Sequence, residues 1–367
     1  MPHCVITGIG MISPLGTGVA ANWNALIKSE SAVEFDSEFG VHIARVKNLP
    51  LPPETRGLAM AFLAAKEALS DAHLDTSPEG VKIGQAIAES KLNLFNLKNA
   101  ATISLSGQLR NVLQLSGARC WASAACATSS MLVINACKMI EAGEADIVLC
   151  GTAEASIHPL YIAGFNNLGV LSTKGVCPFD TNRDGFAISE GAAFIVVESA
   201  KSAVLRNAKV YAQISGYGTG IIGSGLLTME SSKLSKVIEN ASLGTVPDYV
   251  HMHGTATKLN DYEESQAFAS VYGQNSKGIN FSSTKGATGH MLGVSGAVGI
   301  IFSALAIKNN IIPPTLHFTS TDIPFDLNYT PNKAQQKTVN AALSASYGFG
   351  AQGTAIMLKK PLTYGGL

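Results

Sequence analysis

The amino-acid sequence predicts an α/β protein in five layers, α/β/α/β/α, built from two related halves. Two segments, SSMLVINACKMIEAG at residues 129–143 and the stretch that follows His290, have the composition of helices that are apolar on every face. A helix of this kind has to be covered on every face. Short apolar segments typical of buried strands accompany both helices. The simplest arrangement therefore places the two helices between sheets in a layered core.

The first half opens with HCVITGIGMISPLG from His3. A run of small residues then leads to Cys126 and into the first apolar helix, which ends at Gly143, a residue type common at helix C-termini. The segments ADIVLCG, at residues 145–151, and GAAFIVVES, at residues 191–199, are predicted to be buried strands.

The second half repeats this order. VYAQISGYGTG, from Val210, opens it much as the segment from His3 opens the first half. GINFSSTKGATGH leads from a strand through a Gly/Thr turn to His290, and NAALSASYGFGAQGTAIMLKK is typical of two strands around a Gly-rich loop. We therefore expect one half to span residues 1–208 and the other to span residues 209–367.

The composition favours a soluble globular protein. The chain has 367 residues, of which 46% are hydrophobic and 14% charged, and its formal net charge is +0. A chain of that length buries a sizeable core without disulfide cross-links. No basic tract suggests a nucleic-acid or membrane-surface partner. The six cysteines include no CxxC pair and the N-terminus lacks the features of a secretory signal, so we expect reduced thiols and a cytoplasmic location.

The most membrane-like stretch is HMLGVSGAVGIIFSALAIKNN, at residues 290–310. Its apolar run is shorter than the roughly 20 residues that a membrane span needs, and it is rich in small residues. We expect a buried helix and no membrane segment.

Cys126 is the first candidate for chemistry. A thiol at a helix N-terminus meets unpaired backbone N–H groups and the positive end of the helix dipole, and both favour the thiolate. The position therefore predicts a nucleophile. The alternative is a small buried hydrophobic residue, as we expect for Cys137 and Cys150, and from Cys126 alone both interpretations stay open.

YVHMHGTAT is predicted to be a short strand in which His251 and His253 share one face. Two histidines at this spacing could bind a metal, but no further histidine-rich or acidic cluster supplies a third ligand, so we expect no metal site. We expect His251 to be a packed or hydrogen-bonded residue, and His253, at the strand end beside Gly254, to face a cavity.

Lys285 and His290 lie in SSTKGATGHMLGVSGA, a tight turn at the start of the second apolar helix. This position matches that of Cys126 in the first half. A lysine at a helix start usually implies a carboxylate partner. The helix-like stretch NDYEESQAF offers three candidates, Asp261, Glu263 and Glu264. A solvated acidic helix start explains these carboxylates equally well.

Cys126, His253, Lys285 and His290 thus all lie at the ends of predicted elements, where ligand clefts form in layered α/β folds. A thiol with two imidazoles indicates acyl transfer through a thioester. GIGMISPLG, near the start of the chain, is disfavoured as a dinucleotide-binding motif because Ser13 occupies the third glycine position.

Several motifs resemble those of the β-ketoacyl-acyl-carrier-protein synthases, which have the thiolase fold, and the similarity covers most of the chain. AACATSS resembles the nucleophile motif, HGTAT and KGATGHMLGVSGA resemble the two histidine motifs, CPFDTNRDGFAISEGAAFIVVE resembles the segment between them, and SYGFGAQG resembles the gating loop. The pattern is similar to the elongating Cys-His-His type. The second cysteine of degradative thiolases is missing after Cys177, and His290 stands where initiating synthases have Asn.

The resemblance implies a role for each site residue. Cys126 is the acylated nucleophile, and His253 and His290 serve the condensation. The backbone N–H groups of Cys126 and Phe349 form the oxyanion hole. The supporting residues that the resemblance implies are Lys285 and Glu264, as an ion pair that fixes the histidines, and Thr255 and Thr257, as hydrogen-bonding partners of the pantetheine arm.

The implied reaction is a decarboxylating Claisen condensation of the Cys126-bound acyl chain with malonyl-acyl carrier protein, in fatty-acid, polyketide or polyene biosynthesis. It needs no cofactor beyond the phosphopantetheine of the acyl carrier protein. The implied assembly is a homodimer, or a heterodimer with a ketosynthase-like chain-length subunit. The alternative is that the chain is itself a carrier-binding or chain-length subunit, but such subunits tend to lose the nucleophile, which is intact here.

The sequence also departs from the family pattern. The stretch between IGQAIAES and AACATSS is short, which leaves the acyl-chain length open. Val176 and Cys177 stand where a basic residue that docks the acidic carrier protein is common, and Lys174 is the nearest replacement. Four residues around the gating loop differ from the usual ones: Ala345, Ala351, Gln352 and Gly353.

Overall fold

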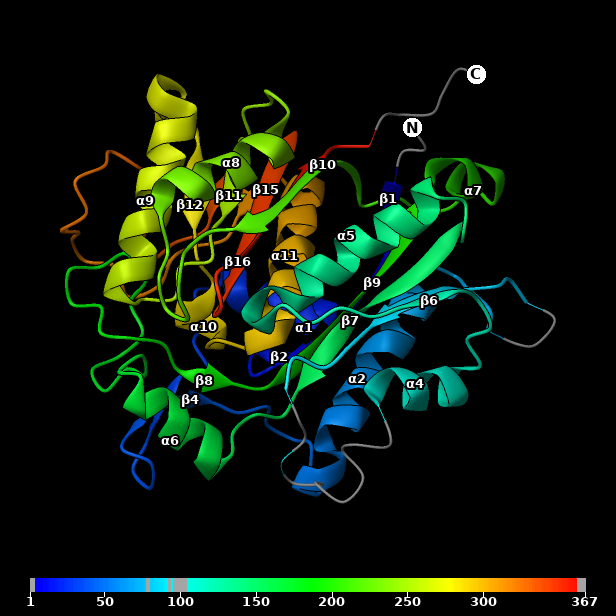
Figure 1. Cartoon of the computed structure of the whole chain (residues 1–367), viewed down its shortest axis with the longest axis horizontal. Coiled ribbons are helices and arrows are strands. Elements are labelled where there is room, and N and C mark those ends of the chain that lie inside the picture. The colour runs from blue at the N-terminus through cyan, green and yellow to red at the C-terminus, as the bar shows by residue number, and fades with distance from the viewer. Residues whose placement is uncertain (1–3, 77–79, 92–93, 95–103, 362–367) are drawn as a thin grey trace.

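The structure, a computed structural model, describes residues 4–76, 80–91, 94 and 104–361 (Figure 1). Its core is a mixed sheet. The strands follow one another in space in the order β12 (Asn280–Ser282), β11 (Tyr249–His251), β15 (Ala341–Gly348), β16 (Gln352–Lys359), β10 (Ala212–Ile221), β1 (Cys4–Ser13), β9 (Gly191–Ser199), β7 (Ile147–Glu154), β5 (Gly84–Ile87) and β6 (Arg119–Cys120). Strand β2 (Gly16–Thr17) pairs with β1 beside this path. The strands predicted at residues 145–151 and 191–199 are confirmed as β7 and β9, and both are buried along their whole length.

The sheet has the same topology on both sides of its centre. In the centre β1 pairs antiparallel with β10, through Cys4–Ile6 and Ala212–Ile214. Outward from β1, the pairings are antiparallel to β9, antiparallel to β7, parallel to β5 and parallel to β6. Outward from β10, the pairings to β16, β15, β11 and β12 have the same sequence of directions. The two halves are therefore built alike, while the boundary at residue 208 stays a prediction.

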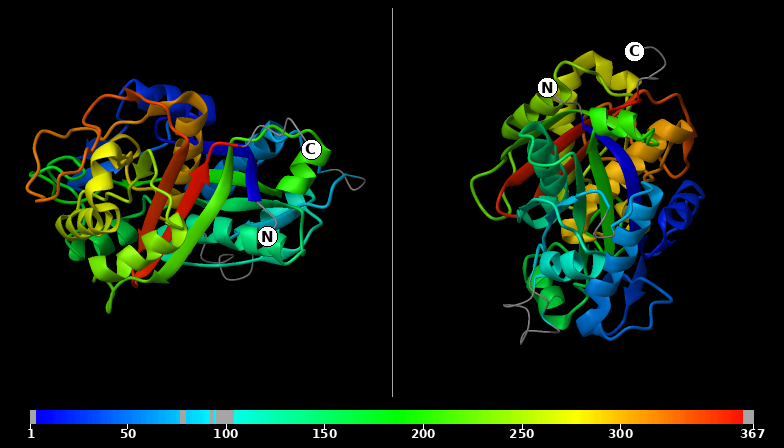
Figure 2. Two further views of the ribbon diagram at one scale, coloured as in Figure 1. Left: turned by 90° about the horizontal axis from the view of Figure 1, so that it is seen from above. Right: turned by 90° about the vertical axis from the view of Figure 1, so that its right-hand side faces the viewer.

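The five predicted layers are present. Helices α5 (Thr128–Glu141) and α11 (Ser295–Asn309) pack against each other in the middle layer, with the β7 side of the sheet on one face and the β15 side on the other (Figures 1 and 2). Helix α2 (Pro53–Asp71) covers the outer face of the first half-sheet. Helices α8 (Ser231–Ser242) and α9 (Lys258–Tyr272) cover the second. We expected separate sheets from the sequence, but the β1–β10 pairing joins the two half-sheets into one.

Small residues let the two central helices approach closely. A Cβ on Gly296 would lie 2.1 Å from Ser130 Oγ, and the Ala297 N–H donates to Ser129 Oγ at 2.8 Å. By length and composition the segment Leu292–Asn309 could cross a membrane, but 89% of it is buried inside the protein. The prediction of a buried helix at this place is confirmed.

The remaining described elements surround this core. A small sheet of β3 (Glu34–Asp36), β4 (Val41–Ala44) and β8 (Ile188–Ser189) lies beside the second histidine turn, because Ile188 forms a bridge to His290. The other elements are α1 (Val19–Ile27), α4 (Leu105–Leu113), α6 (Pro159–Asn167), α7 (Ala200–Leu205), α10 (Lys285–Thr288), β13 (Ile311–Ile312), β14 (Gln335–Gln336) and the 3-10 turns η2 (Ala125–Ala127), η3 (Gly273–Gly278) and η4 (Leu292–Val294). Part of the shortened stretch before Cys126, residues 92–93 and 95–103, lies outside the described residues.

Candidate active site

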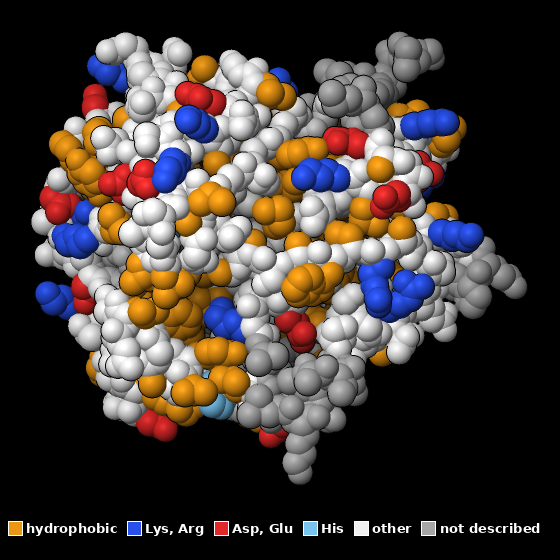
Figure 3. All heavy atoms as spheres, in the orientation of Figure 1, with side chains coloured by type: hydrophobic (Ala, Val, Ile, Leu, Met, Phe, Trp, Pro, Cys, Tyr) orange, Lys and Arg blue, Asp and Glu red, His pale blue; other side chains and the backbone are white. Residues whose placement is uncertain are grey.

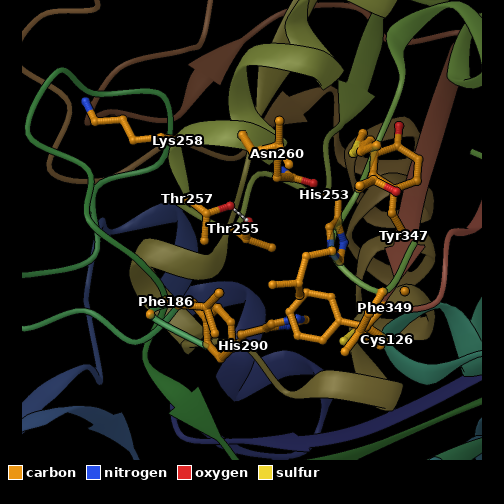
Figure 4. Close-up of a pocket in the computed structure, with 18 of the residues that line it drawn as sticks. Cys126, Phe186, His253, Thr255, Thr257, Lys258, Asn260, His290, Tyr347 and Phe349 are labelled. Carbon is orange, nitrogen blue, oxygen red and sulfur yellow. Dashed lines mark hydrogen bonds between the residues drawn. The ribbon is translucent and has the colours of Figure 1, made fainter. Parts of the chain in front are cut away.

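Six of the predicted site residues line one cavity of about 310 Å³. Cys126 comes from the first half of the chain, whereas His253 and His290 come from the second, and Figure 4 shows the three side chains around the same space. The other three are Thr255, Thr257 and Phe349. The fold therefore brings together the thiol and the two imidazoles that the sequence placed at separate element ends.

Cys126 lies in η2, directly before helix α5, as its predicted place at a helix start requires. Its neighbour Ala125 has a φ of 47°, in the left-handed region that residues with a Cβ rarely adopt. Thr128 stabilises this turn, since its Oγ1 donates to the Ala125 carbonyl at 2.7 Å and accepts the Ala124 N–H at 2.9 Å. Ser346 on β15 donates its hydroxyl to the Cys126 carbonyl at 3.1 Å. These contacts hold the Cys126 turn in one orientation.

Burial raises the pKa of the Cys126 thiol above its usual value. Three groups oppose this increase: the ammonium groups of Lys91 and Lys285, and a hydrogen bond from the Phe349 N–H. The Glu154 carboxylate adds to it. The net shift is therefore opposite to the one expected from the helix start alone. The side chain is only 5% exposed, and the loss of water around it outweighs the nearby positive charges.

His253 is held through its backbone from two directions. The Glu264 carboxylate accepts the N–H groups of His253 and Gly254 at 2.7 and 2.8 Å, and the Lys285 ammonium donates to the His253 carbonyl. Burial lowers the pKa of the His253 imidazole well below its usual value, and the charge of Lys285 lowers it further. The ring is therefore neutral near pH 7.

Lys285 and Glu264 do not form the direct ion pair that the resemblance implied. None of the ion pairs among the described residues joins them; each instead contacts the backbone of His253. Burial lowers the pKa of Lys285 and raises that of Glu264. The other two candidate carboxylates serve elsewhere: Asp261 accepts the Phe179 N–H at 2.7 Å, and Glu263 accepts the Ser231 N–H at 2.7 Å.

His290 is fixed by backbone and side-chain contacts. Its N–H donates to the Ala187 carbonyl at 2.7 Å, and its Nδ1 lies 2.9 Å from Ser295 Oγ. The Phe186 ring packs edge-on against the imidazole, with 4.9 Å between the ring centroids, and the His253 ring lies 5.3 Å away. Burial lowers the pKa of His290 well below its usual value, and Lys285 and Lys91 add to the effect. When the Ser295 hydroxyl donates to Nδ1, the neutral ring carries its proton on Nε2.

Thr255 and Thr257 extend the site away from the cysteine. Their hydroxyl oxygens are 2.9 Å apart, and Figure 4 shows them between the two histidines and Lys258, which lies far from Cys126. Lys258 and Asn260 line the same cavity. The cavity is therefore a channel that leads from the solvent-exposed Lys258 to the buried thiol, with hydroxyl groups along its wall.

The predicted gating loop follows β15 and lies against the turn that carries Cys126. A Cβ on Gly348 would be 2.3 Å from the Ala124 carbonyl oxygen and 3.1 Å from the Cys126 backbone nitrogen. The Phe349 ring packs against Phe165, with 6.2 Å between the ring centroids. The backbone N–H groups of Cys126 and Phe349 thus belong to two segments in direct contact, as an oxyanion hole requires.

Strand β11 ends at His251, so the strand predicted to carry both histidines stops two residues before His253. His253 lines the cavity and His251 does not, as expected. Its Nε2 is 3.1 Å from Thr284 Oγ1. Within the described part of the chain, no group of three or more His, Cys, Asp or Glu side chains is arranged to hold a metal ion.

Comparison with known proteins places the chain in a family. It matches the N-terminal domain of the β-ketoacyl synthases over residues 52–203 and their C-terminal domain over residues 211–319. It is also 33% identical to the 3-oxoacyl-[acyl-carrier-protein] synthase 2 of Staphylococcus aureus (strain COL), in an alignment that covers 97% of this chain and 98% of that protein. The chain belongs to the β-ketoacyl synthase family.

Two solved ketosynthase structures are similar to this β-ketoacyl synthase over 98% of its length and over all of theirs. One, a type II PKS ketosynthase bound to the hexaketide and in complex with its acyl-carrier protein, is 28% identical with a TM-score of 0.91. The other, the ishigamide ketosynthase/chain length factor, is 27% identical with a TM-score of 0.87. The predicted thiolase-like fold class is therefore confirmed.

Several residues at the site of this β-ketoacyl synthase were not predicted from the sequence. Phe186 packs on His290, and Tyr347 packs on His253 with 5.3 Å between the ring centroids. Strand alternation could have indicated Tyr347, which is two residues before Phe349. No local signal indicated Lys91, whose charge acts on Cys126 and His290 although it lies 35 residues before the cysteine.

Proposed function

We propose that this β-ketoacyl synthase catalyses the decarboxylating Claisen condensation of a Cys126-bound acyl chain with malonyl-acyl carrier protein, giving 3-oxoacyl-acyl carrier protein. One observation carries the proposal: a buried thiol and two neutral imidazoles, those of His253 and His290, meet in one channel. This combination suits a reaction that forms an acyl thioester and then develops negative charge beside neutral hydrogen-bond donors.

In the proposed first step, Cys126 Sγ attacks the thioester carbonyl of an acyl carrier protein. The negative charge on the carbonyl oxygen is stabilised by the N–H groups of Cys126 and Phe349. The bond to the carrier sulfur breaks, and the proton of the Cys126 thiol ends on that sulfur. Because burial keeps Cys126 protonated at rest, the thiol supplies the proton that the departing carrier thiolate needs.

In the proposed second step, malonyl-acyl carrier protein replaces the free carrier and loses carbon dioxide. The electron pair of the broken bond forms an enolate, whose oxygen accepts hydrogen bonds from His253 and His290. The enolate carbon attacks the acyl carbon, the bond to Cys126 Sγ breaks, and the thiolate takes up one proton from solvent water. Neutral imidazoles suit this role, because each donates a hydrogen bond through one ring N–H but is a much weaker acid than imidazolium, so it stabilises the enolate without protonating it.

We propose Lys285 and Glu264 as positioning residues and Thr255 and Thr257 as contacts of the pantetheine arm. Glu264 accepts the backbone N–H of His253 and Lys285 donates to the His253 carbonyl, so the two residues hold the backbone that carries the imidazole. The threonine hydroxyls lie along the channel wall, at a depth where a pantetheine amide would pass on its way to Cys126. The reaction needs no cofactor beyond the carrier's phosphopantetheine.

The carrier protein is proposed to dock at the outer end of the channel. Apolar side chains gather around a hollow on the face drawn in Figure 3. Leu226, Leu227 and Leu259 line the cavity and are 60%, 37% and 47% exposed. Lys258 is exposed there but already forms an ion pair with Asp322 at 3.2 Å, so it offers an acidic carrier only part of its charge. Val176 and Cys177 are buried. We therefore propose a docking surface with more apolar contact than ionic contact.

We further propose a soluble, cytoplasmic enzyme without a nucleic-acid or membrane partner, in which residues 1–208 and 209–367 form the two halves. Its assembly is a homodimer, or a heterodimer with a ketosynthase-like chain-length subunit. The solved ketosynthase/chain length factor supports the second arrangement, and the hexaketide-bound ketosynthase supports a polyketide-type pathway. The intact Cys126, His253 and His290 argue against a chain-length subunit without activity of its own.

Incubation with an acyl-carrier thioester tests the proposal by intact mass. We expect an acyl adduct on the wild type and none on Cys126→Ala. Cys120→Ala is the matched control, because this thiol is less buried than Cys126 and would be the site of non-specific acylation. An adduct that survives in Cys126→Ala would contradict the proposal. If the folded protein, with its partner subunit present, binds the carrier but forms no adduct, the result would favour the role of a chain-length subunit.

A further inference from the structure

The imidazole of His290 makes one hydrogen bond among the described residues, and its partner is the hydroxyl of Ser295. The distance from Ser295 Oγ to His290 Nδ1 is 2.9 Å, and the hydroxyl has no other hydrogen-bond partner within that part of the chain. Both residues are buried, with 2% of His290 and 8% of Ser295 exposed. The two atoms therefore depend on each other for a partner, because little bulk water reaches them.

The direction of this hydrogen bond decides what the ring offers to a substrate. Burial and the charge of Lys285 lower the pKa of His290, so the ring is neutral and carries a single N–H. If this N–H were on Nδ1, it would donate to Ser295 Oγ, and Nε2 would be an acceptor without a proton. If the hydroxyl donates to Nδ1 instead, the N–H is on Nε2.

The second direction satisfies more of the buried groups. When Nδ1 carries the proton, the hydroxyl proton of Ser295 has no acceptor among the described residues, and a buried donor without an acceptor costs free energy. When the hydroxyl donates to Nδ1, both of these atoms are paired. The Nε2–H is then left for the cavity that the His290 ring lines (Figure 4).

The backbone holds Ser295 and His290 in this relation. The His290 N–H donates to the Ala187 carbonyl at 2.7 Å, and the His290 carbonyl accepts the Ser189 N–H at 3.1 Å. Ser295 is the first residue of α11, which packs against α5 in the middle layer. The short turn between the two residues thus connects two fixed points, and the hydroxyl stays beside Nδ1.

His253 has no equivalent of Ser295. Its Nδ1 is buried and has no hydrogen-bond partner among the described residues. Burial lowers the pKa of this ring too, so both imidazoles are neutral. Only the ring of His290, however, has a hydrogen bond that selects one tautomer. The two imidazoles of the site are therefore not equivalent.

We propose that Ser295 is a positioning residue that keeps the proton of His290 on Nε2, so that this imidazole meets the enolate as a hydrogen-bond donor. The inference rests on the proposed condensation and deepens it, because Ser295 acts on the reaction through His290. Acylation of Cys126 uses the backbone N–H groups of Cys126 and Phe349, so it does not depend on this tautomer. Malonyl decarboxylation does, because charge then develops on the enolate oxygen.

Ser295→Ala removes the hydroxyl and tests the proposal in the full-length enzyme, with malonyl-pantetheine as the substrate. We expect kcat for decarboxylation to decrease by about two- to tenfold, as for the loss of one neutral hydrogen bond. KM and the rate of Cys126 acylation should not change. Ser295→Thr, which keeps a hydroxyl, should restore most of the decarboxylation rate.

NMR of protein with isotope-labelled histidine reports the tautomer directly. The His290 signals are those that disappear in His290→Gln. In the wild type we expect an unprotonated Nδ1 and a protonated Nε2, and in Ser295→Ala a second form with a protonated Nδ1. A wild-type His290 that carries its proton on Nδ1 would overturn the inference, whatever the variants do.

Ser303→Ala is the matched control. Ser303 lies on the same helix and is fully buried, but its hydroxyl has no hydrogen-bond partner among the described residues. This variant should leave both half-reactions unchanged. A structural role for Ser295 predicts that acylation slows as much as decarboxylation and that Ser295→Thr restores neither, and this result would contradict the proposal. So would wild-type decarboxylation by folded Ser295→Ala.

The outcome for the wild type separates this inference from the proposed function. If the wild type decarboxylates malonyl-pantetheine and only the expected effect of Ser295→Ala is missing, the inference alone fails. If the wild type neither forms the acyl adduct nor decarboxylates malonyl-pantetheine, the proposed condensation fails.

Discussion

Replacing Gly348 by alanine tests whether the gating loop and the nucleophile turn must touch for catalysis. A Cβ at this position would lie 2.3 Å from the Ala124 carbonyl oxygen, and Cβ atoms do not approach such an atom closer than 3.0 Å. The two backbone segments would therefore have to separate by roughly 0.7 Å. They carry the two proposed oxyanion donors, the N–H groups of Cys126 and Phe349. Because a misplacement of about 1 Å can cost a reaction about 10²-fold, we expect Gly348→Ala to slow acylation of Cys126 by about that factor.

The assay is the time course of acyl-adduct formation, followed by intact mass with a saturating thioester. Gly278→Ala is the matched control, because a Cβ at Gly278 meets no atom within 4 Å and the turn η3 lies outside the cavity. Thermal unfolding of both variants separates a local displacement from a loss of folded protein. If Gly348→Ala is folded and acylates at the wild-type rate, the close contact does not position the oxyanion hole and the reasoning is wrong.

Three further predictions concern the imidazoles and the channel mouth. His290→Ala should leave acylation of Cys126 largely intact and slow malonyl decarboxylation by about 10²–10³-fold, as for the loss of one oxyanion donor; equal losses in both half-reactions would contradict the assignment. The folded state keeps His253 and His290 neutral below pH 6.5, where histidines in the unfolded chain bind protons. The free energy of unfolding should therefore decrease as the pH falls below 6.5. The accompanying decrease of Tm should be smaller in a His253→Gln/His290→Gln variant, which lacks both imidazoles. Lys258→Glu should raise KM for an acyl carrier protein by roughly two- to tenfold, and by less for a free pantetheine thioester, whereas equal increases would argue against docking there.

The positions of the main site residues could be predicted because they lie at element ends. The small-residue run before Cys126 and the Gly-containing turns beside His253 and His290 are local signals, and strand ends and helix starts converge in layered folds. The structure places all three in one cavity. The same reasoning separated His253 from His251, whose ring faces Thr284.

Properties that depend on several distant segments could not be predicted. The raised pKa of Cys126 comes from burial by both halves of the chain, and a helix-start argument considers only the local backbone. Lys285 and Glu264 both contact the backbone of His253 and form no direct ion pair, because the residues that follow β11 lie between them. Lys91 lies over the Phe165 ring of α6, and no spacing in the sequence reveals that its charge acts on Cys126.

The two halves use equivalent turns for different purposes. Turn η2 leads into α5 and η4 leads into α11, and in both the first residue, Ala125 or Leu292, has a φ of 47°. The second residue of η2 is Cys126, whereas the second residue of η4 is Gly293. A Cβ on Gly293 would lie 2.5 Å from the Ser90 Cβ and 2.9 Å from Glu154 Oε1, so this place has no room for a second nucleophile.

The second half contributes the imidazoles instead, one from the strand end before α9 and one from the residue two positions before η4. A single symmetric scaffold thus brings a thiol from one half against hydrogen-bond donors from the other. In the proposed mechanism each half alone lacks part of the chemistry, because one half supplies the Cys126 thiol and the other supplies the donors that stabilise the enolate. Condensation therefore requires the packing of α5 on α11, and the close contact between Gly296 and Ser130 is where that packing is tightest among the described glycines of α11.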